Sequence, residues 1–456
     1  MSEVRLSNTI SITGEVRWDS EYYLKNFLAN ETILQKYETK KLSELCNFIK
    51  KGIFDLPPDN YIEKGVPLIR TSEIKNPTID FSTTVYISDE INRNNNKTIL
   101  QPNDIVFTKI GAYIGDVALL PNTFSQYNFS QNVAGASVKN KNNSAFYLAF
   151  FLSKIGRNQI LRSAMLSGQG KLELEDIRNY KIPIITEKLN TNIKNIFQKR
   201  EDYINRSQYL YNEAENLLLE TIGLKNFKPS EKGINVKTFK KSFLTTGRLD
   251  AEYYQPKYEE VERKVKKTGF VYLEDICSAI NYGSVPTSPY TENDEGIPYI
   301  KGLNLKSTFI IRDKLDYIVN TEKLTNKVFT KEGDIIISQM GTVGDVGIVT
   351  RNEAGWIFAS FTIRVRLKKD CGYLPRFIGL YIQNIAKNYY LKQNIAQASV
   401  RQNTDLPTIK RMYIPKVDID IQKQIVDLID ESFSLRRKSE RLLEEAKEMV
   451  EKEMER

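Results

Sequence analysis

The feature that most constrains this chain is an internal repeat, because the second half of the 456 residues repeats the first. The segment Arg-Trp-Asp-Ser-Glu-Tyr-Tyr at 17–23 recurs as Arg-Leu-Asp-Ala-Glu-Tyr-Tyr at 248–254, an offset of 231 residues. At the same offset, Gly-Val-Pro-Leu-Ile-Arg at 65–70 recurs as Gly-Ile-Pro-Tyr-Ile-Lys at 296–301. A register that is kept over many such blocks predicts two copies of one structural unit.

Each copy contains a module whose sequence predicts mainly β-strands. Residues 39–185 and 270–416 are rich in β-branched and aromatic residues, with Gly, Pro and Asn between the runs. Short apolar runs, such as the one at 105–107, predict buried strands. Apolar residues at helical spacing near 145–165 and 374–394 predict helices. We therefore expect an α+β fold with two tandem mixed α/β modules.

Each module is followed by a long amphipathic helix. After Pro183 and Pro415, apolar residues step by four and three alternately, which predicts a coiled-coil-like seam in each copy. The two seams match in length and in where they turn polar, so each helix is expected to pair with the other one. A helix that docks only on its own module is the alternative. The expected seam residues are Ile193, Ile196, Tyr203, Leu210, Leu217, Ile425, Leu428, Leu435, Leu442 and Met449.

These patterns give expected domain boundaries. The parts are an N-terminal segment 1–38 repeated at 232–269, a module 39–185, a helix 186–224, a linker and repeat segment 225–269, a module 270–416 and a C-terminal helix 417–456.

Composition excludes several classes of enzyme and metal site. The chain has no histidine, which removes the commonest general base and every His-containing metal site. Its three cysteines, Cys46, Cys277 and Cys371, lie far apart and are typical of reduced cytosolic thiols. No apolar run reaches the ~18 residues that a membrane span needs, and the start of the chain lacks the pattern of a secretory signal. We expect a cytoplasmic protein without a metal or cofactor.

The charge balance favours a polyanionic partner. Lys and Arg total 66 against 57 acidic residues, which gives a formal net charge of +9. An excess of this size is typical of nucleic-acid-binding proteins and equally of proteins that are merely basic.

The ordered motifs give the chain a family resemblance. Each copy carries Arg-x-Asp-x-Glu-Tyr-Tyr, then Gly-(Val/Ile)-Pro-x-Ile-(Arg/Lys), an Asp-Ile-(Val/Ile) strand, a Gly-Asp-Val turn and an Ile-Pro exit into the long helix. In this order the chain resembles the specificity subunit of type I restriction-modification enzymes over nearly its whole length. The resemblance implies two target recognition domains, each of which reads one half of a split site in double-stranded DNA. It also implies that the helices pair antiparallel as a spacer, with a pseudo-twofold internal repeat. The implied partners are two methyltransferase (modification) subunits and two motor-nuclease (restriction) subunits.

Candidate DNA contacts lie in loops where the two copies differ. After the strand at 105–108, Lys109 could reach guanine or phosphate, and its counterpart Gln339 could pair with adenine. A plain strand-to-strand turn is the equal alternative. Arg70 and Lys301 are interpreted as phosphate contacts, with surface salt bridges as the alternative. The expected DNA-binding residues are Arg70, Thr71, Lys109, Tyr113, Gln169, Lys171, Lys301, Asn304, Gln339, Thr342, Arg401 and Gln402.

Other functions fit the sequence less well. An amino-methyltransferase needs (Asn/Asp/Ser)-Pro-Pro-(Tyr/Phe), whereas the nearest match is Leu-Pro-Pro-Asp at 56–59. The glycines at 168–171 lack the spacing of a nucleotide-binding loop. A helical adaptor that does not read DNA remains an alternative, as does a recognition subunit of a related system that is not type I. The expectation is a non-catalytic protein.

Overall fold

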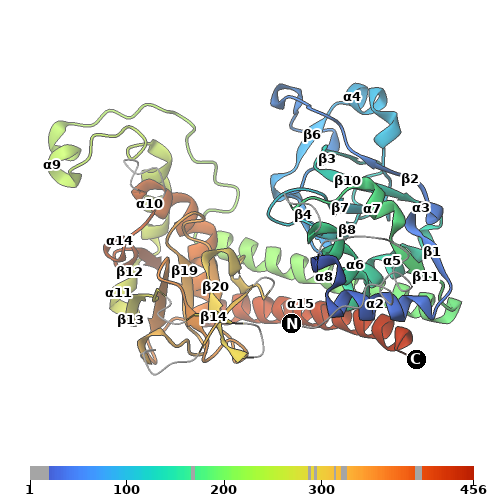
Figure 1. Cartoon of the computed structure of the whole chain (residues 1–456). Coiled ribbons are helices and arrows are strands. Elements are labelled where there is room, and N and C mark those ends of the chain that lie inside the picture. The colour runs from blue at the N-terminus through green and yellow to red at the C-terminus, as the bar shows by residue number, and fades with distance from the viewer. Residues whose placement is uncertain are drawn as a thin grey trace. The chain divides into compact units, whose positions relative to one another are not determined.

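The structure is a computed structural model, and it describes residues 20–165, 170–285, 289–291, 295–312, 315–319, 326–395 and 403–455. The chain divides into two compact units (Figure 1). Unit 1 comprises Met1–Ile204 with Arg437–Arg456, and unit 2 comprises Asn205–Arg436. Each unit therefore combines one module with helical segments from both copies of the repeat.

The sheets of unit 1 lie around one central, antiparallel sheet with the strand order β2-β10-β7-β8. A second sheet has the order β6-β3-β9, in which β3 and β9 are parallel. Two further pairs are β1 with β11 and β4 with β5. The strands are β1 (Thr39–Lys41), β2 (Cys46–Lys51), β3 (Val66–Ile69), β4 (Ile74–Lys75), β5 (Thr78–Ile79), β6 (Val85–Ile87), β7 (Ile105–Thr108), β8 (Val117–Leu119), β9 (Asn128–Phe129), β10 (Val133–Val138) and β11 (Lys181–Pro183).

Helices cover one face of this central sheet, as Figure 1 shows for α5 and α6. The α-helices are α2 (Lys25–Gln35), α3 (Leu42–Leu45), α4 (Asp89–Asn94), α5 (Ser144–Leu152), α6 (Lys154–Met165) and α7 (Leu174–Asn179). The 3-10 turns are η1 (Ser20–Tyr23), η2 (Pro58–Asn60), η3 (Phe81–Thr83), η4 (Asn96–Thr98) and η5 (Lys141–Asn143).

The apolar run at 105–107 explains why β7 lies in the centre. Ile105 and Phe107 point into the core beneath α5 and α6, whereas Val106 points into a second core on the other face. Successive side chains of a strand alternate between faces, so a strand buried on both sides must be apolar throughout.

Unit 2 repeats this topology with one additional strand, β14, in its second sheet. Its central sheet has the order β13-β22-β19-β20, and its second sheet has the order β14-β18-β15-β21, with β15 and β21 parallel. The remaining pairs are β12 with β23 and β16 with β17. The strands are β12 (Phe270–Tyr272), β13 (Cys277–Tyr282), β14 (Tyr290–Thr291), β15 (Ile297–Ile300), β16 (Leu305–Lys306), β17 (Phe309–Ile310), β18 (Asp316–Ile318), β19 (Ile335–Ser338), β20 (Val346–Ile348), β21 (Ile357–Phe358), β22 (Thr362–Leu367) and β23 (Tyr413–Pro415). This repetition confirms the expected tandem α+β modules.

The helices of unit 2 differ from those of unit 1 mainly in one segment. Where unit 1 has α6, unit 2 has a π-helical segment, η10 (Ile382–Leu391), which the sequence did not predict. The other helices are α9 (Phe243–Thr246), α10 (Pro256–Lys267), α11 (Leu273–Ile276), α12 (Pro375–Tyr381), α13 (Lys392–Asn394) and α14 (Leu406–Lys410), with the 3-10 turns η6 (Phe239–Lys241), η8 (Gly302–Asn304) and η9 (Asn326–Val328).

Two long helices follow the modules and pair antiparallel. They are α8 (Glu187–Thr221) and α15 (Ile419–Met454). In unit 1, the beginning of α8 shares a core with the end of α15, through Ile193 and Ala446. In unit 2, the end of α8 shares a core with the beginning of α15, through Leu218 and Ile425. The helix pairing is thus confirmed, and none of the described helices is long and apolar enough to cross a membrane.

The buried stripe of these helices departs from the expected heptad seam. Ile193, Leu210 and Ile425 are buried as expected. The half-buried flanks of the stripe hold the other expected seam residues, Ile196, Tyr203, Leu217, Leu428, Leu435, Leu442 and Met449. Their neighbours Leu218, Ile429, Phe433 and Val450 are the deeply buried ones. Both helices also contact the cores of the modules, so the buried face is wider than a two-stranded seam and follows the 3.6-residue period.

Candidate nucleic-acid interface

In unit 1, two loops that are distant in sequence meet beside the end of β7. Ile110 forms an isolated antiparallel bridge with Lys171. The amide of Leu172 donates to the main-chain carbonyl of Lys109, with a nitrogen–oxygen distance of 2.9 Å. The structure therefore brings together Lys109 and Lys171, two of the DNA contacts that the sequence predicts.

Unit 2 builds the same junction with different side chains. Met340 forms the equivalent bridge with Asn403, and the amide of Thr404 donates to the carbonyl of Gln339 at 3.1 Å. The amides of Lys109 and Gln339 are likewise held by equivalent carbonyls, those of Asn132 at 2.9 Å and Phe361 at 3.0 Å. We call these two junctions the reading cradles.

The tips of both cradles are open. Gly111 and Gly341 have φ values of +117° and +80°, which side chains other than glycine rarely adopt. Nothing lies within 4 Å of the Cβ that either residue lacks. In unit 1 the ring of Tyr113 is exposed, with the ammonium of Lys75 4.9 Å from its centroid. In unit 2 Thr342 is exposed. Such a tip leaves room for a close approach by a ligand.

Lys109 has the most unusual environment of the predicted residues. It is only 5% exposed, and among the described residues its ammonium is influenced by burial and by the charges of Lys171, Glu173 and Lys51, with no side-chain hydrogen bond. Burial lowers the pKa of Lys109, and the nearby charge of Lys171 lowers it further; Lys51 acts in the same direction. Glu173 opposes this shift, but its carboxylate is paired with Lys171 at 2.7 Å.

Arg70 forms the ion pair that was the alternative to a phosphate contact. Its Nε and one Nη donate to the carboxylate of Glu73 at 3.2 and 2.8 Å, and that Nη also donates to the carbonyl of Thr83 at 2.7 Å. Hydrogen bonding to the buried Glu73 raises the pKa of Arg70. Thr71 lies half-buried in the same turn. A phosphate contact by either residue stays a prediction.

In unit 2, the equivalent turn contains two of the expected contacts, Lys301 and Asn304. The ammonium of Lys301 is paired with Asp316 at 2.5 Å. Asn304 is fully buried, where its Oδ1 accepts from the amide of Lys301 at 2.9 Å and its Nδ2 donates to the carbonyl of Ile311. The amide of Asn304 thus closes a turn beneath the surface, and a DNA contact by Asn304 or Lys301 stays a prediction. The predicted contacts Gln169, Arg401 and Gln402 lie outside the described residues.

Sequence reasoning missed residues that flank the cradles. Lys51 ends β2, and its ammonium lies 5.2 Å from the centroid of Phe54, which is 69% exposed. The counterpart of Lys51 is Tyr282, at the end of β13. The sequence contained a signal for this position, because Gly52 follows Lys51 and Gly283 follows Tyr282 at the repeat offset. A Cβ on Gly52 would lie 1.9 Å from the carbonyl oxygen of Phe129.

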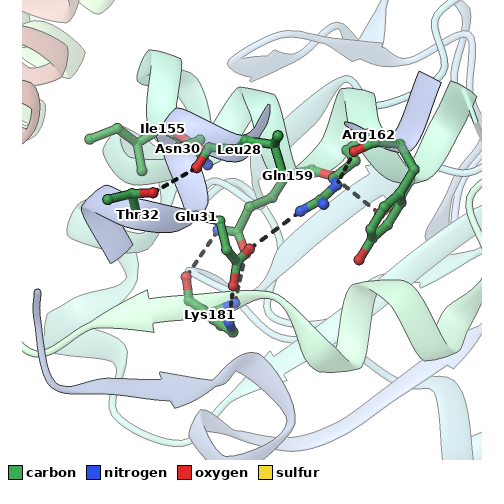
Figure 2. A network of polar contacts seen from close by, with 10 residues as sticks. Leu28, Asn30, Glu31, Thr32, Ile155, Gln159, Arg162 and Lys181 are labelled. Carbon is green, nitrogen blue, oxygen red and sulfur yellow. Dashed lines mark hydrogen bonds and ion pairs between the residues drawn. The ribbon is translucent and has the colours of Figure 1, made fainter. Parts of the chain in front are cut away.

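A polar network holds α6, the helix that precedes the loop of Lys171, against α2 and β11 (Figure 2). The carboxylate of Glu31 accepts from Arg162 at 3.3 Å and is paired with Lys181. Gln159 forms two hydrogen bonds with the main chain of Lys181. Its Nε2 donates to the carbonyl oxygen of Lys181 at 3.0 Å, and its Oε1 accepts from the amide N–H of Lys181 at 2.9 Å. Arg162 also lies over the ring of Tyr22, 3.6 Å from its centroid.

Unit 2 fills the equivalent place with aromatic rings. The counterpart of Lys181 is Tyr413, whose ring packs edge-on against Tyr390 at 5.3 Å. Glu262, the counterpart of Glu31, pairs with Lys266 of its own helix, at 2.5 Å. Gln393 donates to the carbonyl of Tyr253 at 3.0 Å, as Arg162 donates to that of Tyr22 at 3.1 Å. The repeated tyrosines therefore anchor the helix before each variable loop.

Comparison with protein families gives two matches to one family. The family described as "Type I restriction modification DNA specificity domain" matches residues 35–216 and 266–447. Each match spans one module and most of the long helix that follows it. Among curated proteins there is no match.

Several solved structures resemble the chain at low identity. The S subunit of a type I restriction-modification system from M. genitalium is 13% identical, with a TM-score of 0.38 and coverage of 91% of this chain and 93% of that one. The HsdS subunit from Thermoanaerobacter tengcongensis is 13% identical, with a TM-score of 0.29 and coverage of 91% and 96%. A structure described as concerning complex assembly and conformational transition of the type I R-M system is 15% identical, with a TM-score of 0.30 and coverage of 92% and 97%.

Proposed function

The chain belongs to the family of type I restriction-modification DNA specificity domains, of which it carries two copies, and we propose that each copy reads one half of a bipartite DNA site. In this proposal the chain supplies recognition and no catalysis. The paired helices α8 and α15 set the number of unspecified base pairs between the two halves.

The observation that carries the proposal is the pair of reading cradles. Both are built by the same main-chain hydrogen bonds, at Lys109 and Leu172 in unit 1 and at Gln339 and Thr404 in unit 2. Their side chains differ, since Lys109 and Lys171 are replaced by Gln339 and Asn403. A shared frame with divergent side chains is what two readers of different base sequences require.

The proposed partners are double-stranded DNA, two methyltransferase subunits and two motor-nuclease subunits. The exposed faces of α8 and α15 are rich in charged residues and offer the methyltransferase subunits a docking surface along each helix. Among the described residues, no group of three or more Cys, Asp and Glu side chains could hold a metal ion. In this proposal the subunit has no cofactor of its own. We propose that it acts in the cytoplasm, where host DNA is methylated.

The test is to co-express the chain with its methyltransferase partner and to map methylated bases in the host DNA. We expect a motif of two short defined halves around an unspecified spacer of fixed length. A continuous motif would contradict the two-reader arrangement. A stable complex that leaves DNA unmethylated and has no salt-sensitive DNA affinity would favour a helical adaptor instead.

A related experiment tests the spacer. Inserting seven residues into α8 and seven into α15 at facing positions turns each buried face by only about 20° at 3.6 residues per turn, so the register is nearly kept. If the helices set the spacer, the insertion lengthens the unspecified stretch and leaves both halves of the motif unchanged. A motif with an unaltered spacer would show that the helices do not determine it.

A further inference from the structure

The strongest unexplained feature of the molecule is the side chain of Lys109. It is 5% exposed, and burial and neighbouring charges act on its ammonium without a side-chain hydrogen bond from the described residues. The nearest charges are mostly of the same sign, because Lys171 and Lys51 both disfavour the protonated form. Holding a cation in a largely buried place beside two other lysines is costly, so a lysine in this place needs a reason other than the fold.

Unit 2 shows that the fold does not require this lysine. Gln339 occupies the equivalent position, and its main chain forms the same two hydrogen bonds, to Phe361 and from Thr404. The cradle is therefore built by the backbone, and the side chain at this position is free to serve a ligand. An ammonium has three donors and no acceptor, so that ligand must present acceptor atoms.

On DNA, acceptors belong either to phosphates or to base edges. Phosphates are the same in every half-site, so contacts with them should be shared by both modules. The three lysines around the unit 1 cradle are not shared. Lys51, Lys109 and Lys171 are replaced by Tyr282, Gln339 and Asn403 at the equivalent positions. This divergence favours base edges over phosphates.

The geometry points to the following assignment, which rests on the proposed function: Lys109 reads a guanine in the half-site of unit 1, whereas Gln339 reads an adenine at the equivalent step of the other half-site. Guanine presents two acceptors, O6 and N7, in the major groove, which suit an ammonium. Adenine presents the N7 acceptor and the N6 donor, which suit a carboxamide.

The neighbouring residues support these two roles. In unit 1 the ammonium of Lys171 is held by Glu173 at 2.7 Å, so Lys171 closes the cradle while Lys109 keeps its donors. In unit 2 the backbone of Asn403 is bridged to that of Met340, so a residue with a carboxamide takes the place that Lys171 has in unit 1. We expect the aliphatic stem of Lys109 to stay buried in the cradle when DNA binds, while its ammonium extends to the edge of the base.

The experiment exchanges the two side chains in the methyltransferase complex. The variants are Lys109→Gln, Gln339→Lys and the control Lys50→Gln. Lys50 precedes Lys51 on β2 and therefore points to the opposite face of the strand. The control removes the same charge from the same module. Methylated motifs are mapped for each variant, and thermal unfolding of each purified complex checks folding.

With Lys109→Gln, we expect one position in one half of the motif to lose its preference for guanine and gain one for adenine. Discrimination at that position should change by roughly 5- to 150-fold. Gln339→Lys should produce the reverse change in the other half, and Lys50→Gln should leave the motif unaltered.

Two results would overturn the assignment and leave the two-reader function intact. One is an unaltered motif with uniformly weaker methylation and a smaller salt dependence in Lys109→Gln, which would identify a phosphate contact. The other is a wild-type motif without guanine in the half that Lys109→Gln affects. A wild-type complex without any bipartite motif would overturn the proposed function itself.

Discussion

The hydroxyl oxygens of Ser207 on α8 and Ser432 on α15 lie 2.9 Å apart, fully buried in unit 2. Each hydroxyl is also within hydrogen-bond distance of the other residue's main-chain carbonyl oxygen, at 2.9 and 2.8 Å. Leu210 and Ile429, each three residues from one of the serines on its helix, are buried apolar residues. A polar pair in an apolar helix interface favours one axial register over others, because any slip would bury each hydroxyl without its partner.

We predict that the two serines act as a pair. Ser207→Ala and Ser432→Ala should each destabilise unit 2 by about 1 kcal/mol, since each leaves the remaining hydroxyl with fewer partners. The double variant should cost less than the sum of the two, which a double-mutant cycle measured by urea unfolding would detect. Ser434→Ala, at an exposed position of the same helix, serves as the control. Strictly additive costs would contradict the coupling.

The Glu31 network should contribute more to stability than its counterpart in unit 2. Glu31→Gln removes the counter-charge of Arg162, whose side chain is 11% exposed, and of the more exposed Lys181. We expect a loss of about 2 kcal/mol in the unfolding free energy of unit 1. Glu262→Gln should cost less than about 0.5 kcal/mol, because the pair of Glu262 with Lys266 lies on a partly exposed helix face. Equal effects in chemical denaturation would refute this difference.

Replacing Lys109 should stabilise the free protein while it impairs recognition. Lys109→Met removes a cation that burial and the charge of Lys171 disfavour, so we expect a gain of about 1 kcal/mol at neutral pH. The pKa of Lys109 in the folded state lies below its ordinary value of 10.5. Between these two pKa values the unfolded chain binds more protons, so the stability of the wild type rises with pH in that window.

The advantage of Lys109→Met should therefore shrink as the pH approaches 10.5, where the unfolded lysine also loses its proton. Unfolding of both proteins at several pH values between 7 and 10.5 would show this convergence. A constant difference over the whole range would mean that the buried charge is not its cause.

The three cysteines should differ in reactivity. Burial raises the pKa of Cys46 to about 12, with Asp104 adding to the shift, and burial raises the pKa of Cys277 to about 12 as well. At pH 8 the thiolate fraction of each is on the order of 10⁻⁴, whereas Cys371 is half-buried. Alkylation followed by mass spectrometry should modify Cys371 first, and the other two only after unfolding. Rapid labelling of Cys46 in the native protein would contradict this order.

The sequence alone predicted the elements that depend on apolar periodicity. The runs at 105–107 and 335–337 form the central strands β7 and β19, because only a strand buried on both faces is apolar throughout. The repeat offset predicted that unit 2 would have the topology of unit 1. It also paired Lys109 with Gln339 and Lys171 with Asn403 across the two cradles.

What the sequence did not predict depends on contacts between elements. A strict heptad selected Leu217, but the module core turns the buried face of α8 toward Leu218. Asn304 looked like a surface amide, because nothing in its local sequence reveals that it closes a turn on Lys301. The pairing of Arg70 with Glu73 is three residues in span and could have been recognised as an ion pair.

The division of the chain into units has a consequence for the order of synthesis. Ala446, Val450 and Met454 of α15 are buried in the core of unit 1, beside Ile193. The ribosome makes these residues only after all of unit 2. The hydrophobic core of unit 1 is therefore complete only once the end of α15 has been synthesised. A chain that terminates near residue 436 would then keep a complete unit 2 and an unfinished unit 1. Premature stops late in the gene should consequently impair recognition of the half-site read by the module that was synthesised first.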